Sequence, residues 1–192
     1  VTPSTGAIQV FAGSQMGSVD GTGTSAQFKY PVKITTDGTS LFVVGGNNGN
    51  HIIRKIVIST AVVTTFAGLA GTAGFIDGTG TSARFNQPSG ITNDGVNLYT
   101  ISKHGNGIRK IVINTAVVTT FAQGVKGTGI TTDGTNLYVA DPYNDVIKKV
   151  VIATGVISTF AGSGNSSYQD GTGTNASFEA PRGIVTDGTN LY

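Results

Sequence analysis

Short runs of β-branched, aliphatic and aromatic residues alternate with polar turn sequences along the whole chain. No segment keeps a helical period, so helices are expected to be single turns at most. Asp-Gly between two such runs favours a tight hairpin, because glycine adopts positive φ without steric cost. The clearest unit has runs at 89–93, 97–101, 108–113 and 117–121. This pattern predicts a four-stranded antiparallel meander.

The same unit recurs along the chain. Phe-Ala-Gly, or Phe-Ala-Gln, begins at Phe11, Phe66, Phe121 and Phe160, with spacings of 55, 55 and 39 residues. Self-similarity at such a period is typical of propellers, solenoids and arrays. Four-stranded sheets arranged around an axis cover one another on both faces, which accounts for third runs that are apolar on both sides. We therefore predict an all-β fold, a β-propeller of four-stranded antiparallel blades.

The repeat also predicts the blade boundaries. We expect a fourth strand at 7–13, complete blades at 31–68, 88–123 and 127–162, and a partial blade at 181–192. So few blades would make a small ring, and a second strand stopping at Tyr192 would leave an unpaired edge. We favour a segment of a larger propeller ring, with a partner chain that completes the ring as the alternative.

A loop sequence, Asp-Gly-Thr-Gly-Thr-x-Ala-x-Phe, precedes three of the four units. It begins at Asp20, Asp77 and Asp170, and the unit after Phe121 lacks it, which explains the shorter spacing. Thr or Ser can cap one helical turn here, and the Phe would anchor the loop to its blade. A Ca²⁺ loop draws several carboxylates, and a phosphate loop needs a following helix and usually a Lys. We interpret the loop as structural.

Composition excludes several classes of function. The 192 residues include 29 Gly but no Cys, so disulfides and thiolate chemistry are excluded. The net charge of +2 is too small to direct the chain towards nucleic acid or anionic lipid. No apolar run approaches the roughly 18 residues of a membrane span.

The acidic residues argue against catalysis. Seven of the ten are Asp followed by Gly, which is turn chemistry. Only Asp141, Asp145 and Glu179 are left, whereas acid–base catalysis needs groups that converge within hydrogen-bond reach. The sequence therefore predicts no enzyme, no catalytic residue, no cofactor and no metal site.

Two histidines and two breaks in the repeat provide the candidate ligand-binding residues. His51 and His104 lie between second and third strands, at positions that are not equivalent. A metal shared by the two would need a third ligand, for which Asp145 is the repeat-equivalent candidate, so loop histidines bonded to backbone are favoured. With the residues where the repeat symmetry breaks, the candidate binding set is Asn47, Asn48, His51, His104, Pro142 and Tyr143.

Basic pairs recur once per blade, at Arg54-Lys55, Arg109-Lys110 and Lys148-Lys149. Arrayed in an arc, they raise the alternative of an RNA-binding face. Neighbouring strand residues point to opposite faces, however, so only one of each pair can face a common ligand. We expect snorkelling side chains at the blade edges and a local ion pair between Asp145 and Lys148.

The segment Asn50-His51-Ile52-Ile53-Arg54-Lys55-Ile56 resembles the Asn-His-Leu signature of the NHL repeat, and 144–149 and 106–109 resemble it more weakly. The resemblance covers essentially the whole chain. It implies an NHL-type β-propeller, and it further implies a bacterial protein that is secreted, periplasmic or on the cell surface. It does not fix the function, because propellers host lyases, lactonases, RNA binders and scaffolds.

From these observations we expect a non-catalytic scaffold or binding module that recognises a protein or another ligand through its inter-strand loops. The expected partner is a protein, or further blades that complete the ring, and nucleic acid is not expected. The alternatives are a lactonase or lyase with a central metal, and an RNA-binding propeller.

Overall fold

The computed structural model describes residues 8–45, 50–103 and 107–192, and regular structure in this part of the chain is almost entirely β-strand. Three antiparallel sheets follow one another. The first contains β2 (Pro31–Thr36), β3 (Ser40–Gly45), β4 (Ile52–Val57) and β5 (Val62–Gly68), with the short β1 (Gly21–Thr22) outside β5. The second contains β7 (Pro88–Asn93), β8 (Asn97–Ser102), β9 (Ile108–Val112) and β10 (Val117–Ala122), with β6 (Gly78–Thr79) outside β10.

The third sheet has four strands instead of five. It contains β11 (Gly129–Thr132), β12 (Asn136–Asp141), β13 (Val146–Val151) and β14 (Ile157–Ala161). The extra strand of the other two sheets is the start of the Asp-Gly-Thr loop, which this unit lacks. Strand number therefore follows directly from the presence of the loop.

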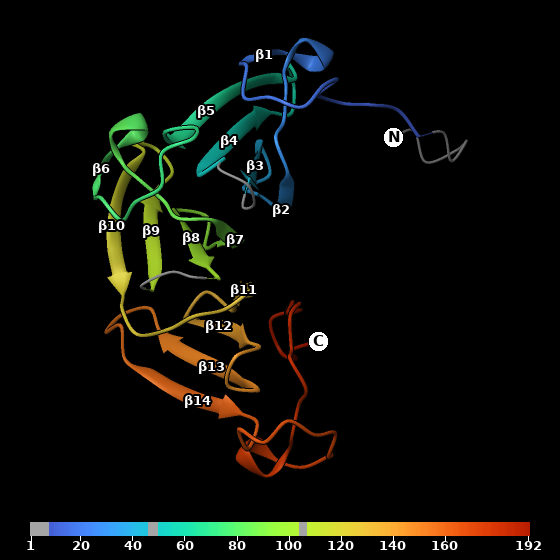
Figure 1. Cartoon of the computed structure of the whole chain (residues 1–192), viewed down its shortest axis with the longest axis vertical. Coiled ribbons are helices and arrows are strands. Elements are labelled where there is room, and N and C mark those ends of the chain that lie inside the picture. The colour runs from blue at the N-terminus through green and yellow to red at the C-terminus, as the bar shows by residue number, and fades with distance from the viewer. Residues whose placement is uncertain (1–7, 46–49, 104–106) are drawn as a thin grey trace.

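The sheets are arranged along an arc, with β2, β7 and β11 on its inner side and β5, β10 and β14 on its outer side (Figure 1). The inner strands contact one another in that order. Each sheet is thus a blade, and the predicted all-β propeller of antiparallel blades is confirmed as a partial propeller.

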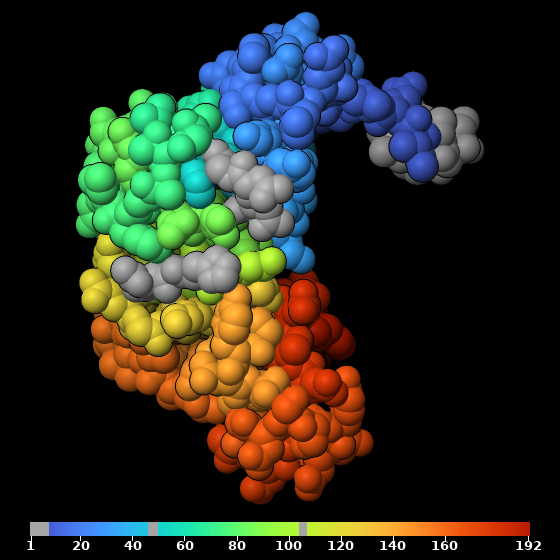
Figure 2. Space-filling model, in the orientation of Figure 1, coloured from blue at the N-terminus to red at the C-terminus, as the bar shows by residue number. Residues whose placement is uncertain are grey.

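The two ends of the chain differ from the predicted strands. Ile8 is 97% exposed where the chain extends away from the first blade, whereas Ala12 packs against a buried cluster of that blade and Gly13 N–H donates to the Gly23 oxygen at 3.0 Å (Figure 2). Residues 8–13, the described part of the fourth strand expected at 7–13, are not in a strand. Residues 181–192 form a hairpin held by one bridge between Thr186 and Leu191 and by backbone hydrogen bonds of 3.0 and 2.9 Å between Val185 and Tyr192.

Buried apolar clusters join neighbouring blades. Ile53 of β4 packs in the cluster shared with the second blade, whereas Ile56 packs on the opposite face of the same strand. Ile108 and Ile111 of β9 divide between two clusters in the same way. The third strands are apolar on both sides because both of their faces are covered.

The repeated Phe of Phe-Ala-Gly occupies a β-bulge. Arg54 pairs with Thr65 and Ile53 with Ala67, so Phe66 has no partner in the ladder, and Phe121 and Phe160 are skipped in the same way. Because a bulge re-aims a side chain, each Phe meets an aromatic ring of the second strand. The centroids are 5.2 Å apart for Phe42 and Phe66, and the other two pairs, Tyr99–Phe121 and Tyr138–Phe160, are at 5.5 and 5.1 Å. Each edge-to-face pair stabilises its blade by about 1 kcal/mol.

The Asp-Gly turns are braced by their own carboxylates. Asp133 Oδ1 accepts hydrogen bonds from the N–H groups of Thr135 and Asn136 at 2.8 and 2.6 Å, and its Oδ2 accepts one from the Tyr138 hydroxyl at 3.0 Å. Asp37, Asp94 and Asp187 brace their turns in the same manner. The turn interpretation of these four residues is confirmed.

These hydrogen bonds change the acidity of the carboxyl groups. Burial alone would raise the pKa of Asp133, but the bonds from Asn136, Thr135 and Tyr138 outweigh it and lower that pKa from 3.8 to about 2. The pKa values of Asp37 and Asp94 are also lowered: burial again opposes ionisation, and the turn hydrogen bonds outweigh it.

Acid should therefore unfold the blades in a defined window. Because the folded-state pKa lies below the unfolded value, the stabilisation is complete above about pH 4 and is lost as the pH falls towards about 2. Melting temperatures followed by circular dichroism should drop across this window. Asp133→Asn should lower the melting temperature at neutral pH and flatten the drop. Glu179→Gln, an exposed acid outside the turns, should keep the wild-type profile, and a constant wild-type melting temperature from pH 4 to 2 would contradict the prediction.

Candidate functional site between the second and third blades

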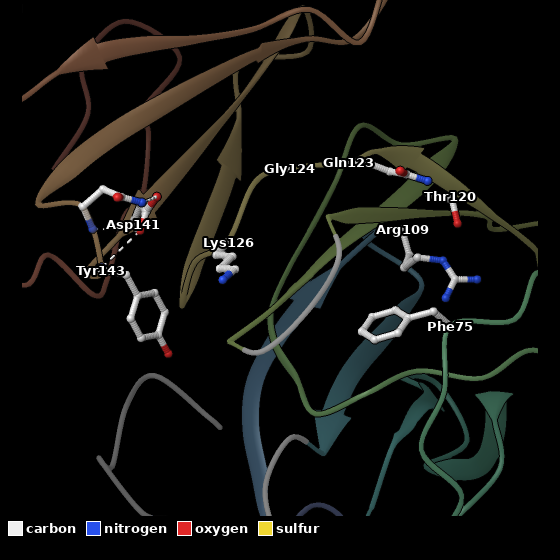
Figure 3. Close-up of a pocket in the computed structure, with 9 residues that line it drawn as sticks. Phe75, Arg109, Thr120, Gln123, Gly124, Lys126, Asp141 and Tyr143 are labelled. Atoms are coloured by element: carbon white, nitrogen blue, oxygen red, sulfur yellow. Dashed lines mark hydrogen bonds between the residues drawn. The ribbon is translucent and has the colours of Figure 1, made fainter.

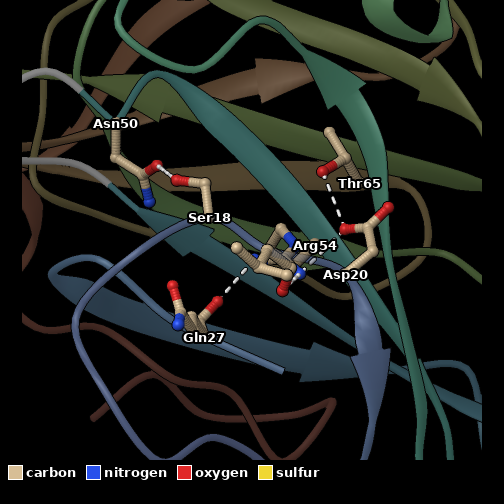
Figure 4. Close-up of polar contacts among 7 residues, drawn as sticks. Ser18, Asp20, Gln27, Asn50, Arg54 and Thr65 are labelled. Carbon is tan, nitrogen blue, oxygen red and sulfur yellow. Dashed lines mark hydrogen bonds and ion pairs between the residues drawn. The ribbon is translucent and has the colours of Figure 1, made fainter. Parts of the chain in front are cut away.

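A buried arginine fastens the Asp-Gly-Thr loop to the first blade. Arg54 of β4 is 1% exposed, and its terminal nitrogens donate to the backbone oxygens of Gln27 and Val19 at 2.7 and 3.0 Å (Figure 4). The same guanidinium forms an ion pair with Asp20 at 2.9 Å, and Thr65 donates to that carboxylate at 3.1 Å. The loop and the two outer strands are thereby joined at one point.

The second blade repeats this contact. Arg109 of β9 is 3% exposed and donates to the oxygens of Arg84 and Ile76 at 2.8 and 3.0 Å and to Asp77 at 2.7 Å. Burial lowers the pKa of Arg109, and Asp77 acts in the opposite direction. Within the described part of the chain, the Nε atoms of Arg54 and Arg109 have no hydrogen-bond partner, so the terminal nitrogens donate all of the observed hydrogen bonds.

We expected Arg54 and Arg109 to extend into solvent at the blade edges, and this prediction is wrong because both side chains are buried. Sequence reasoning assigned Asp20 and Asp77 to turns, but their carboxylates accept the arginines instead. Successive side chains of a strand point to opposite faces, and at each site the arginine is the member of the basic pair that points towards the loop.

The third blade lacks both the loop and the arginine. Lys148 takes the arginine's place and donates to Thr159 at 2.9 Å. The expected ion pair with Asp145 is not formed, because Asp145 accepts the backbone N–H of Ala180 at 2.7 Å. With no loop to fasten, a shorter and solvated cation suffices at this position.

Where the loop is absent, a cleft of about 580 Å³ separates the second and third blades. The chain crosses there directly from β10 to β11. Figure 3 shows Tyr143 on one wall, Phe75 and Arg109 on the other, and Lys126 between them. Gln123 and Asp141 also line the cleft.

The charged groups of the cleft differ in availability. Asp141 is 2% exposed, and its carboxylate accepts the N–H groups of Tyr143 and Asn144 at 3.1 and 3.2 Å and the Asn144 amide at 2.7 Å. It therefore braces the turn that presents Tyr143, which is 52% exposed. Lys126 is exposed, and the ion pairs within the described residues do not include it. The cleft thus offers aromatic surface and one available cation.

The described residues among those selected from the sequence, His51, Pro142 and Tyr143, are not brought together at one site. Tyr143 lines the cleft, and Pro142 precedes it without lining the cleft. Asn47, Asn48 and His104 lie outside the described residues.

His51 has a structural contact elsewhere. It is 5% exposed, and its Nδ1 accepts the backbone N–H of Gln87 at 3.1 Å. Burial, followed by the charge of Lys29, lowers the pKa of His51, which favours the neutral imidazole that can accept this bond. Asp145, its repeat equivalent, makes the corresponding bond, and both residues have positive φ, 51° and 54°. His51 and Asp145 thus fix the backbone immediately before Pro88 and Pro181.

Sequence reasoning missed Phe75, Gln123, Lys126 and the role of Asp141. One signal pointed to them, namely the shortened 39-residue spacing that marks the missing loop. Within residues 8–45, 50–103 and 107–192, no group of three or more His, Cys, Asp or Glu side chains is placed to hold a metal ion. The same residues contain no helix long and apolar enough to cross a membrane.

Known proteins similar to this chain share its repeat. It is 29% identical to NHL repeat-containing protein 2 of Bos taurus over 107 residues, and 29% identical to that of Homo sapiens over 105 residues. These matches cover 55% and 54% of this chain but only 15% and 14% of the relatives' length. No protein-family model matches the sequence.

Solved structures share the fold. A chain of Kuenenia stuttgartiensis hydrazine synthase superposes with a TM-score of 0.57 at 19% identity, covering 84% of this chain and 41% of that one. A chain of a nidogen/laminin complex gives a TM-score of 0.56 at 14% identity, covering 84% and 70%. The bladed architecture and these likenesses define the class, a β-propeller. The curated relatives are NHL repeat-containing proteins, and this chain is similar to them over about half of its own length.

The arginine contact should be a major source of stability only where the loop is present. Arg109→Met removes the guanidinium donors from the oxygens of Ile76 and Arg84 and from the Asp77 carboxylate, so the free energy of unfolding should fall by roughly 2–4 kcal/mol. Lys148→Met, the equivalent change in the third blade, should cost less than about 0.5 kcal/mol. Urea unfolding measures both, and equal losses would contradict the proposed difference between the blades.

Proposed function

We propose that this chain is a non-catalytic recognition module whose inter-blade cleft binds a short acidic loop of a protein partner. The observation that carries the proposal is the coincidence of three features at one place. The repeat loses its loop there, Tyr143 is exposed on a braced turn, and Lys126 is an available cation. Loops that depart from a repeated scaffold are where propellers and other rigid folds vary their contacts.

The chemistry of the cleft favours binding over catalysis. Asp141 is fully used by the turn that it braces, and Arg109 is held by Asp77 and two carbonyl groups. A general base must reach the proton that it removes, and neither group is placed to serve a substrate. Lys126 and Tyr143 instead offer a cation and an aromatic face, which suit recognition of a carboxylate next to apolar surface.

Neighbouring folds are compatible with this proposal. The nidogen/laminin complex contains a chain with the same fold in a protein–protein assembly, which supports a protein ligand. The hydrazine synthase chain leaves the enzyme alternative open at the level of fold. The RNA-binding alternative is weakened, because two of the six basic residues expected in the arc, Arg54 and Arg109, are buried. Family resemblance alone supports the further proposal of a secreted or surface location in a bacterium.

Selection from a displayed random peptide library should yield acidic peptides that bind the whole chain. Lys126→Ala and Tyr143→Ala should each weaken binding of a selected peptide about tenfold in fluorescence anisotropy, since charged and aromatic anchors dominate such contacts. The matched exposed residues Lys33 and Tyr168 lie outside this cleft, so Lys33→Ala and Tyr168→Ala should leave affinity unchanged. Failure to select any binder, or binders indifferent to both cleft variants, would contradict the proposed function.

A further inference from the structure

The innermost strands of the arc follow one another closely and share a repeated run of residues. β2, β7 and β11 contact one another in that order, and the start of the C-terminal hairpin lies beside β11 (Figure 1). The run before each Asp-Gly turn contains an isoleucine at the same place, namely Ile34, Ile91, Ile130 and Ile184. Aligning these isoleucines shows where the inner side chains depart from the repeat.

The residue before that isoleucine is glycine in three of the four runs. At two of them the neighbouring inner strand leaves little room for a side chain. A Cβ at Gly90 would lie 3.0 Å from the Thr128 oxygen, and a Cβ at Gly129 would lie 2.5 Å from the Arg182 oxygen. The first run has Lys33 at this position instead. The repeat therefore does not account for a lysine there.

Two further cations depart from the repeat. Arg182 occupies the position that Ser89 and Thr128 hold in the two preceding runs. Lys103 follows β8, at the position of Pro142 in the third blade. These positions are not equivalent to each other or to that of the inner lysine, so each cation is a separate departure from the blade pattern.

All three cations line one cavity of about 190 Å³ where the inner strands begin, here called the inner cavity. The described residues that line it include no acid. The ion pairs of the described residues belong to Arg54 and Arg109, and all ten acidic residues of the chain lie in the described ranges. Within the described structure, no carboxylate of this chain is paired with Lys33, Lys103 or Arg182.

Hydroxyl groups fix the walls of the inner cavity. Ser89 is buried, and its hydroxyl lies 3.2 and 3.1 Å from the oxygens of Ile101 and Gly127, to which it donates. The Thr128 hydroxyl donates to the Arg182 oxygen at 2.8 Å. Because both hydroxyl protons are used within the protein, the side-chain donors left for a ligand are the three cations.

Three like charges at one place repel one another unless an anion lies between them. Lysine binds phosphate as a point charge, and arginine can donate two parallel hydrogen bonds to it. A phosphate group carries nearly two negative charges at neutral pH, whereas a single carboxylate carries one. The charge and the size of the inner cavity therefore favour a phosphate group.

Lys33 also lines a second cavity of about 260 Å³, here called the inner channel, which runs along the inner strands. The other residues of its lining are mainly glycine, isoleucine and threonine, such as Thr35, Thr92 and Thr131. The two cavities thus adjoin at Lys33. A phosphate group in the first would leave the second for the organic part of a phosphomonoester.

We propose that Lys33, Lys103 and Arg182 bind the phosphate group of a small molecule in the inner cavity. The three residues belong to the first blade, the second blade and the C-terminal hairpin, so the bound anion connects three parts of the fold. The lining of the inner cavity shares no residue with that of the cleft of the proposed function. The two sites are therefore independent.

Isothermal titration calorimetry of the whole chain with inorganic phosphate, at constant ionic strength, tests this site. Binding should be saturable with a Kd of about 1 mM or less, because three charge-assisted contacts act together. Acetate should bind at least about tenfold more weakly, because it carries half the charge. Lys33→Ala, Lys103→Gln and Arg182→Gln should each weaken phosphate binding about tenfold.

Two control variants separate charge from structure. Lys103→Arg keeps the positive charge and should retain the affinity for phosphate. Lys148→Gln removes a cation that lies outside both cavities and donates to Thr159, so it should leave the affinity unchanged. Circular dichroism verifies that each variant is folded before binding is compared.

Glycerol 3-phosphate as a second ligand distinguishes the two sources of a phosphate group. Tighter binding than inorganic phosphate would assign the inner channel to the organic part, and equal binding would assign the site to free phosphate. No saturable phosphate binding, equal binding of acetate, or undiminished binding by the three charge-removing variants would overturn the proposal. Single-stranded RNA that binds more tightly than both ligands and is lost in the same variants would overturn the small-molecule ligand.

Discussion

The buried guanidinium between the third strand and the Asp-Gly-Thr loop is the contact that decides how the outer edge of each blade is covered. A buried charge is tolerated only with an opposite charge and with hydrogen bonds to its nitrogens, so the arginine and the loop must occur together. The first two blades have both, and the third has neither, with Lys148 at the arginine position. This single coupling sets the number of strands in each sheet and opens the space between the second and third blades.

The cleft is thus a consequence of the same constraint that stabilises the other blades. Deleting the loop alone would have left a buried guanidinium without acceptors, and replacing the arginine alone would have left the loop without its fastening. Because both changed, the blade stays intact and an uncovered surface appears beside it. Arg109 still belongs to the wall of the cleft, but its contacts with Asp77 keep it rigid. The variable contacts then come from Lys126 and Tyr143, which the repeat does not constrain.

The sequence predicted the fold well, because strand period, Asp-Gly turns and the Phe repeat are local signals that agree with one another. It did not predict the roles of Asp20 and Asp77, since the same dipeptide marks a braced turn at Asp133 and an arginine acceptor at Asp77, and only the partner in space distinguishes the two. Lys126 had no local signature at all.

Charge contributes specificity more than affinity at the cleft of the proposed function. Lys126 is exposed, so a carboxylate that reaches it gains little from charge alone and depends on the aromatic walls for affinity. The aromatic surface of the cleft therefore sets how tightly a partner binds, and Lys126 sets the sign of the charge that is accepted.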